Sequence, residues 1–197
     1  MPTDRALSSK GRQTRQAIAD SARNLFAERG FHGTTLSDIT SAAGKSPASF
    51  YRYFADKEDL LAVLAEDFLH DLTDIPRSVD GDDFFVSAVS IYWERVKPNV
   101  GIMTAIDQLA STSARFALLQ NRFRRFGMDT VSASLGHARQ QGYAPDAQGE
   151  HIALAIALLF ERFTSVSISE GLSDHAAVTT LSTIWRRTLY GVVAGEH

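Results

Sequence analysis

The apolar residues of the chain recur three or four positions apart over almost its whole length. Between residues 11 and 29, for example, Ile18, Ala22, Leu25 and Phe26 make one apolar stripe. Alternating runs of β-branched residues, which are typical of strands, are missing from the sequence. The pattern therefore predicts an all-α fold.

Capping and turn residues set the expected ends of about nine helices. The first covers about 11–29, and Gly30 then suits a C-terminal cap. Two short helices follow, at 36–43 and from 47 to 53 or 54, and Asp56 caps a longer one that reaches about residue 72. Five further helices are expected near 82–97, 99–111, 113–141, 146–171 and 174–193.

The two short helices and their connection form a helix-turn-helix pattern. Thr35 can cap the first, because Asp38 follows it in the spacing of a capping box. Gly44 permits a tight turn. Ser46 can cap the second helix, and Pro47 stands at its first position, where a missing N–H costs nothing.

The second short helix is too short and too polar on one side to belong to a bundle. Phe50 and Phe54, four residues apart, can anchor it to the core. The opposite side would then present Pro47, Ala48, Ser49, Tyr51 and Arg52 to the surroundings.

This outward side suits the major groove of DNA. Ser49 can donate to or accept from a base edge, and Pro47 and Ala48 can contact thymine methyl groups. Phosphate oxygens suit the polar groups around it, Lys45, Tyr51 and Arg52.

Two helix N-termini extend the same site. Thr35 offers a hydroxyl and free backbone N–H groups to a phosphate. Lys57 places an ammonium beside the positive end of a helix dipole, a repulsion that a bound phosphate would relieve. The plainer interpretation is that these cations are solvated and the aromatics fill the core. The agreement of caps, turn and helix lengths favours the helix-turn-helix.

The amino-acid composition excludes several classes of protein and site. The 197 residues include no cysteine, which excludes a disulfide scaffold, cysteine-ligated zinc and a thiol nucleophile. The net charge of −3 argues mildly against nucleic acid, but it is unevenly distributed. Residues 1–57 include nine basic and five acidic residues, and the rest of the chain includes 11 basic and 18 acidic residues. A head of charge +4 on a body of charge −7 fits DNA binding by the head alone.

Other classes of site have no support in the sequence. The polar N-terminus has no signal-peptide pattern, and the longest apolar run, Ile152–Phe160, is too short for a span of about 20 residues. We therefore expect a soluble, cytoplasmic protein with no membrane partner. No two of the six histidines stand three or four residues apart, so no metal or cofactor is expected. No nucleophile elbow or phosphate-cradling glycine loop points to an enzyme.

Residues 11–64 strongly resemble the N-terminal domain of TetR-family transcriptional regulators. The resemblance rests on three segments, 34–39 (TTLSDI), 42–46 (AAGKS) and 50–61 (FYRYFADKEDLL). It implies an all-α homodimer with a DNA-binding domain at 1–56 and a ligand-binding and dimerisation domain at 57–197. The family's DNA contacts correspond here to Thr35, Lys45, Pro47, Ala48, Ser49, Tyr51, Tyr53 and Lys57. Lys45 departs from the small apolar residue usual in the family.

The C-terminal half is more weakly similar to the ethionamide-regulator branch of that family, through 158–162 (LLFER) and 184–191 (IWRRTLYG). That likeness implies a long, mostly apolar pocket. By position, it would be lined by Phe85, Tyr92, Phe123, Phe160, Glu161 and Trp185. Core packing is the alternative for the aromatics. For Glu161 the alternatives are a polar anchor for ligand, a structural ion pair and a place in a dimer interface.

The helices expected at 146–171 and 174–193 are the predicted homodimer surface, because Ala153–Phe163 is apolar on nearly all sides. A buried helix of a monomer would show the same pattern.

The leading hypothesis for the function is a repressor that binds a pseudo-palindromic operator as a homodimer and is released by a small lipophilic ligand. The alternative is a helical ligand-binding or adaptor protein whose helix-turn-helix does not read DNA.

Overall fold

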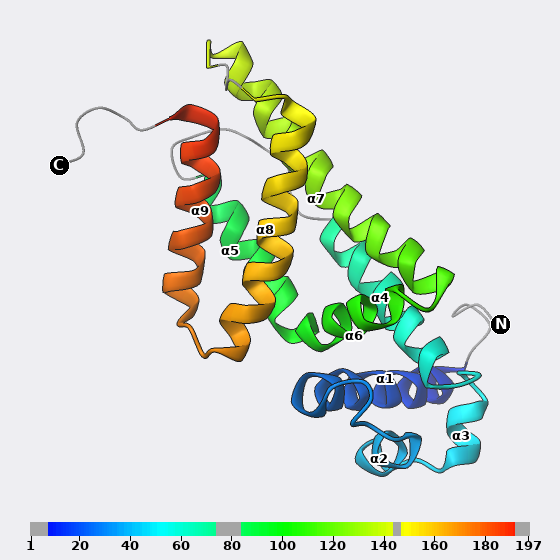
Figure 1. Cartoon of the computed structure of the whole chain (residues 1–197). Helices are drawn as coiled ribbons and strands as arrows, with labels where there is room; N and C mark the ends of the chain where they lie inside the picture. The colour runs from blue at the N-terminus through cyan, green and yellow to red at the C-terminus, as the bar shows by residue number, and fades with distance from the viewer. Residues whose placement is uncertain (1–7, 74–83, 144–146, 192–197) are drawn as a thin grey trace. The chain divides into compact units, whose positions relative to one another are not determined.

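Nine α-helices, α1 to α9, make up most of the computed structural model, which describes residues 8–73, 84–143 and 147–191 (Figure 1). In order they are α1 (Ser9–Arg29), α2 (Leu36–Ala42), α3 (Pro47–Tyr51), α4 (Lys57–Thr73), α5 (Phe84–Val96), α6 (Val100–Ala110), α7 (Ala114–Gln140), α8 (Gly149–Ser169) and α9 (Asp174–Tyr190). A 3₁₀ turn, η2 (Lys97–Asn99), joins α5 to α6. No strand occurs in the described residues, so the all-α prediction is confirmed.

The helix ends follow the predicted caps closely. Asp56 caps α4, since its carboxylate accepts the backbone N–H of Asp59 at 2.7 Å. α3 ends at Tyr51, earlier than predicted, although the N–H groups of Tyr53 and Phe54 still bond to the carbonyl of Phe50 in a hydrogen-bonded turn. The helix positions predicted at 82–83, 146 and 192–193 lie outside the described residues.

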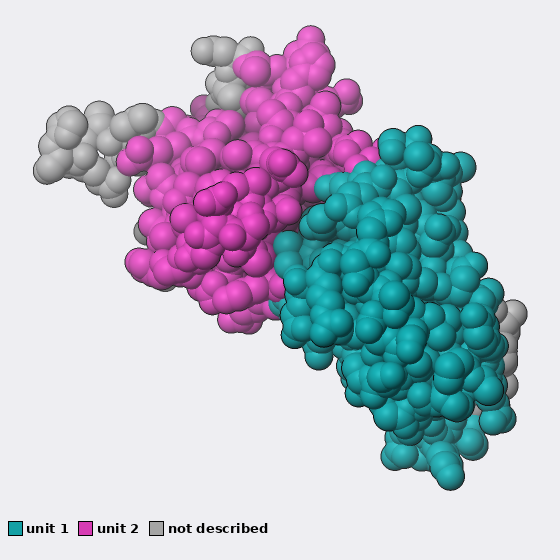
Figure 2. Space-filling model, turned by 60° about the horizontal axis from the view of Figure 1, so that its bottom comes forward, with its two compact units in different colours: residues 1–70, 98–119 teal, residues 71–97, 120–197 magenta. Residues whose placement is uncertain are grey.

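The helices group into two compact units, which Figure 2 colours separately. Unit 1 comprises Met1–His70 and Pro98–Leu119, and unit 2 comprises Asp71–Lys97 and Gln120–His197. This structural division does not coincide with the functional boundary expected after residue 56, because most of α4, all of α6 and the start of α7 group with the helix-turn-helix.

Unit 1 is built around the apolar stripe of α1. Ile18, Ala22 and Phe26 are fully buried there, as are the anchors Phe50 and Phe54 of the helix-turn-helix. The rings of these two anchors lie 5.5 Å apart, which confirms the predicted pairing four residues apart.

The approach of α6 to α1 explains why the two helices belong to one unit. A Cβ atom added at Gly101 would lie 2.5 Å from the backbone nitrogen of Ala27 and the carbonyl carbon of Phe26. Only glycine permits this approach. Beside it, Nε of Arg23 donates to Oδ1 of Asn99 at 3.0 Å.

Ion pairing also ties the start of α7 into unit 1. Arg115 on α7 donates to the carboxylate of Asp59 on α4 at 3.1 Å, and the side chain of Asp59 is only 10% exposed. The other oxygen of Asp59 accepts the N–H of Ala55 at 3.1 Å. The acidic group is therefore satisfied on both sides, which fixes the N-terminus of α4 against α7.

Unit 2 is a bundle of α5, α7, α8 and α9 around an aromatic-rich core. α7 and α8 approach closely at Gly127, where an added Cβ would lie 3.2 Å from that of Ala157. The end of α5 is fastened to the start of α9, because Trp93 Nε1 donates to Asp174 Oδ1 at 2.9 Å and Lys97 Nζ to the same oxygen at 2.7 Å. These donors hold the pKa of Asp174 below its ordinary value.

α8 is both long and apolar. A window of 18 residues within it reaches a mean hydropathy of 1.6, so by length and composition alone it passes as a membrane span. Core helices of soluble proteins pass the same test, and 33% of this window is buried inside the structure. The outer face of α8 carries Leu154, Leu158 and Val166, each about 40% exposed (37%, 42% and 40%).

Candidate functional site

The first helix of the helix-turn-helix begins with the predicted capping box. The Thr35 hydroxyl accepts the N–H of Asp38 at 3.1 Å, and Asp38 Oδ2 accepts the backbone N–H of Thr35 at 2.8 Å. The hydroxyl also donates to that carboxylate at 2.6 Å, and these bonds hold the pKa of Asp38 below its ordinary value. Both polar groups of Thr35 are thus used within the chain, so a phosphate contact there would have to displace Asp38 or use the N–H groups that follow.

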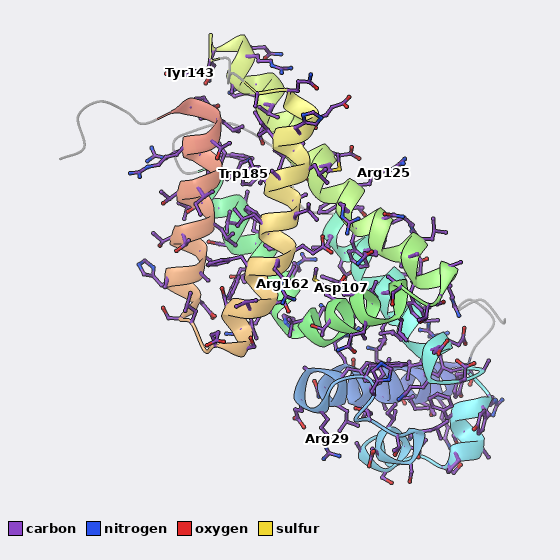
Figure 3. All side chains as sticks on the ribbon, viewed as in Figure 1. Arg29, Asp107, Arg125, Tyr143, Arg162 and Trp185 are labelled. Atoms are coloured by element: carbon purple, nitrogen blue, oxygen red, sulfur yellow. The ribbon has the colours of Figure 1, made fainter. Side chains whose placement is uncertain are left out.

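Asp38 also lies near a cation. Its second oxygen is 3.8 Å from the guanidinium of Arg29, which extends from the end of α1 toward α2 (Figure 3). Both side chains are exposed, so the pair adds little stability. Its effect is to balance the negative charge of the capping box beside the proposed DNA contact.

The second short helix, α3, exposes four of the five residues that the sequence predicts to face outward, and the fifth, Ser49, is half-buried. Ser46 caps it by accepting the N–H of Ser49 at 3.2 Å, after a turn in which Gly44 has a φ of 62°. Phe50 is fully buried, whereas Tyr51 is 61% exposed. The exposed side of the helix and its flanks comprises Ser46, Pro47, Ala48, Tyr51 and Arg52.

Three other predicted contact residues are half-buried, Lys45, Ser49 and Tyr53. The hydroxyl of Ser49 lies 3.1 Å from that of Ser46, so the two share a hydrogen bond. Each hydroxyl can still accept from or donate to an outside group. The structure therefore gathers these predicted residues around α3 within unit 1.

Lys57 makes contacts that the sequence did not reveal. Its ammonium donates to the carbonyl oxygens of Phe31 and Thr34, each at 2.7 Å, and lies 4.2 Å from the centre of the Phe31 ring. Burial lowers the pKa of this lysine from its ordinary value. The first residue of α4 is thus bound to the connection between α1 and α2. One of its three N–H donors remains for a phosphate.

In unit 2, the structure brings together most of the residues predicted to line a ligand pocket. The ring of Trp185 on α9 lies 5.1 Å from that of Phe85 on α5 and 5.7 Å from that of Phe160 on α8. Phe160 in turn lies 5.3 Å from Tyr92 on α5. Trp185, on α9, is labelled in Figure 3.

Glu161 stands next to Phe160 and is not isolated. Its carboxylate lies 3.7 Å from Nε of Arg124 on α7, and the two side chains are 16% and 26% exposed. The structure therefore provides the ion pair that the sequence left as one of three alternatives for this residue. The pair stands beside the aromatic cluster, because Glu161 directly follows Phe160.

Tyr92 completes the polar side of the cluster. Its hydroxyl lies 3.4 Å from that of Thr164, and burial, assisted by the charge of Glu161, raises the pKa of Tyr92 to about 12. Phe123, the sixth predicted lining residue, is buried on α7 directly before Arg124. Sequence reasoning missed Arg124 and Thr164, because neither has a local signal that distinguishes it from an ordinary helical residue.

A metal site has no support in the described part of the chain, where no group of three or more His, Asp or Glu side chains is placed to hold an ion.

Comparisons with known proteins agree with this arrangement. A family model described as bacterial regulatory proteins, tetR family, matches residues 18–64, which span the helix-turn-helix. The chain is 26% identical over 186 residues to the HTH-type transcriptional regulator EthR of Mycobacterium tuberculosis (strain ATCC 25618 / H37Rv), covering 89% of this chain and 86% of that protein. It is 33% identical over 115 residues to the HTH-type transcriptional repressor KstR2 of Rhodococcus jostii (strain RHA1), and this match covers 49% of this chain and 55% of that protein.

Solved structures show the same fold. The fatty acid degradation regulator FadR from Bacillus halodurans matches with a TM-score of 0.69 at 18% identity, covering 91% of this chain and 96% of that one. At this level of sequence identity, the likeness shows a shared arrangement of helices and nothing about function.

Proposed function

Because the chain belongs to the TetR family of transcriptional regulators, which are not enzymes, we propose that it is a ligand-responsive repressor. In this proposal a homodimer binds a pseudo-palindromic operator and leaves it when a small, mostly apolar ligand binds in unit 2. The protein would act in the cytoplasm, on double-stranded DNA.

The observation that carries the DNA-binding part is the division of α3 into two sides. Phe50 is fully buried, and beyond it Phe54 is 1% exposed, so the helix cannot rotate without losing its anchors. The two residues after Phe50, Tyr51 at 61% exposure and Arg52, are exposed. A short helix held by two aromatic anchors, with exposed polar groups on its other side, suits insertion into a major groove.

An apolar face supports the homodimer. Leu154, Leu158 and Val166 recur four or eight residues apart along α8, with the exposed Arg162 at the position between the last two, and Ile184 on α9 is 38% exposed. Residues at this spacing lie on one face of a helix. Contact with a second copy through α8 and α9 would cover these groups, and two-fold symmetry of the dimer would match two half-sites about 34–36 Å apart.

The aromatic cluster of unit 2 supports the ligand-responsive part. It combines large apolar rings with a few polar groups, Tyr92, Thr164 and Glu161, which is the composition of small-molecule sites. Ligand binding there would favour a conformation of the dimer that no longer fits the operator.

One observation favours the adaptor alternative. The first turn of α3 presents Pro47 and Ala48, which have no side-chain hydrogen-bonding group for base edges. An adaptor would keep the fold and the dimer while forming no specific DNA complex.

A mobility-shift assay on the DNA upstream of the gene separates the two functions. We expect a specific complex at moderate salt, which a lipophilic ligand dissociates. Tyr51→Ala should weaken the complex by about threefold to tenfold, the effect of one lost polar contact. Tyr143→Ala is the matched control, because Tyr143 is also exposed (46%) and also packs against one neighbouring ring, outside the helix-turn-helix. No specific complex with wild-type protein would favour the adaptor.

A further inference from the structure

The indole N–H of Trp185 is a buried donor that has no hydrogen-bond acceptor among the described residues. The residue is 4% exposed, so solvent does not reach it freely. The other tryptophan of the chain, Trp93, donates its N–H to Asp174 at 2.9 Å. Buried donors in native proteins are nearly always paired, so an exception requires an explanation.

The neighbours of Trp185 offer that N–H no good acceptor. Three phenylalanine rings lie around the indole at roughly perpendicular angles, Phe84 at 5.8 Å, Phe85 at 5.1 Å and Phe160 at 5.7 Å. The face of an aromatic ring accepts an N–H only weakly. The donor is therefore available to a stronger acceptor that comes from outside the chain.

A second polar donor near the cluster shows which charge such an acceptor should have. Nε of Arg124 is also buried without a hydrogen bond among the described residues, but its positive charge is balanced by Glu161 at 3.7 Å. Glu161 follows Phe160, the ring of which contacts that of Trp185, so an anionic ligand at the indole would add a second negative charge to this part of unit 2. A neutral oxygen adds none, so the charges of Arg124 and Glu161 favour a neutral acceptor.

We propose that Trp185 Nε1 donates a hydrogen bond to a neutral oxygen of the effector, a ketone, ester or amide carbonyl attached to an apolar group. This inference rests on the proposed ligand-responsive function and adds to it the chemical class of the ligand. Trp185 then acts as more than a lining residue, because its N–H distinguishes a carbonyl compound from a hydrocarbon of the same shape.

The test uses three small probes on the full-length protein. Acetophenone carries the carbonyl, α-methylstyrene replaces its oxygen by a methylene group, and benzoate replaces the methyl ketone by an anion. The readout is a ¹⁵N–¹H titration that follows the two indole resonances, which Trp93→Phe assigns. Trp93 is an internal control, since its N–H already has an acceptor.

We expect acetophenone to bind at least threefold more tightly than α-methylstyrene, as one added hydrogen bond implies. The Trp185 indole proton should move downfield with acetophenone, while that of Trp93 stays in place. Trp185→Phe should remove the preference. The wild-type measurements stand without this variant if it fails to fold.

Each other result overturns the inference. Equal or tighter binding of α-methylstyrene shows that the N–H selects nothing, and tightest binding of benzoate indicates an anion site at Arg124. Binding of neither neutral probe excludes the carbonyl class from this site. The proposed function fails differently, in the absence of an operator complex or of its release by any ligand. A hydrocarbon that releases the operator would leave the proposed function intact and refute the inference.

Discussion

The ammonium of Lys57 lies 2.7 Å from the carbonyl oxygen of Phe31 and 4.2 Å from the centre of the ring of the same residue. One side chain thus binds both the backbone and the aromatic face of the turn that leads from α1 to α2. Since Lys57 is the first residue of α4, the contact fixes where α4 begins relative to the helix-turn-helix. Lys57 therefore has a structural role in addition to its predicted contact with phosphate.

Removal of this ammonium should destabilise the protein. Lys57→Met keeps an apolar side chain of similar length but removes the ammonium that donates to the carbonyls of Phe31 and Thr34, and among the described residues only the carbonyl of Phe31 keeps another donor, the N–H of Thr34. We expect the free energy of unfolding to fall by about 1–2 kcal/mol, the effect of losing hydrogen bonds from a charged group at a half-buried site. Unfolding in denaturant measures this change in the free energy of unfolding. Lys45→Met is the matched control and should change the free energy by less than about 0.5 kcal/mol.

The same two variants test the phosphate contacts. If Lys57 uses its remaining N–H on the DNA backbone, Lys57→Met lowers the slope of log K against log salt by about one unit. We expect a similar decrease for Lys45→Met, without the loss of stability. Binding measured at several salt concentrations gives the slope. An unchanged slope would remove the lysine concerned from the set of phosphate contacts.

The close approach of α6 to α1 predicts a large effect at a single glycine. Gly101→Ala places a Cβ atom 2.5 Å from the backbone of Phe26 and Ala27, so the two helices must separate. We expect a loss of about 1–3 kcal/mol or more, as for other overpacked sites. Gly136→Ala on α7 is the control, because open space surrounds that position, and it should stabilise the helix by about 0.5–1 kcal/mol. Thermal unfolding of both variants checks the pair; equal stability would contradict the close approach.

Tyr92 should make the protein sensitive to alkaline pH. Its folded-state pKa of about 12 exceeds the ordinary value of 10.0. The unfolded chain therefore loses this proton first, so the contribution is complete below pH 10 and is lost as the pH rises toward 12. Tyr92→Phe should flatten the decline of unfolding free energy over that range. Denaturation at several pH values measures the decline, and Tyr51→Phe, at an exposed site, should retain it.

The exposed face of α8 predicts the oligomeric state. Leu158→Glu introduces a charge into the apolar face that the proposed homodimer would bury, so the variant should be monomeric at concentrations where the wild type is a dimer. Light scattering during gel filtration reports the mass. Leu118→Glu on α7 is the control, because Leu118 is even more exposed (62% against 42%) but lies outside that face. A wild-type monomer, or a Leu158→Glu dimer, would refute this interface.

The sequence alone determined the local features of the protein. The bonds of Thr35 with Asp38, of Ser46 with Ser49 and of Asp56 with Asp59 join residues three positions apart. Residues so close in the chain interact whenever the helix forms, so their spacing predicts the helix starts. The outward side of α3 follows from the same logic, since Phe50 and Phe54, four residues apart, are both buried against the core of unit 1.

Only the tertiary structure decided the contacts between distant segments. Nothing near Lys57 in the chain indicates that its ammonium binds the backbone at Phe31 and Thr34, or that Gly101 touches α1. The pairing of Arg124 with Glu161 and the unpaired N–H of Trp185 likewise depend on how α5, α7, α8 and α9 pack. Periodicity shows which face of a helix is buried. Which partner it meets depends on the free energy of packing many side chains at once, which no short segment of sequence contains.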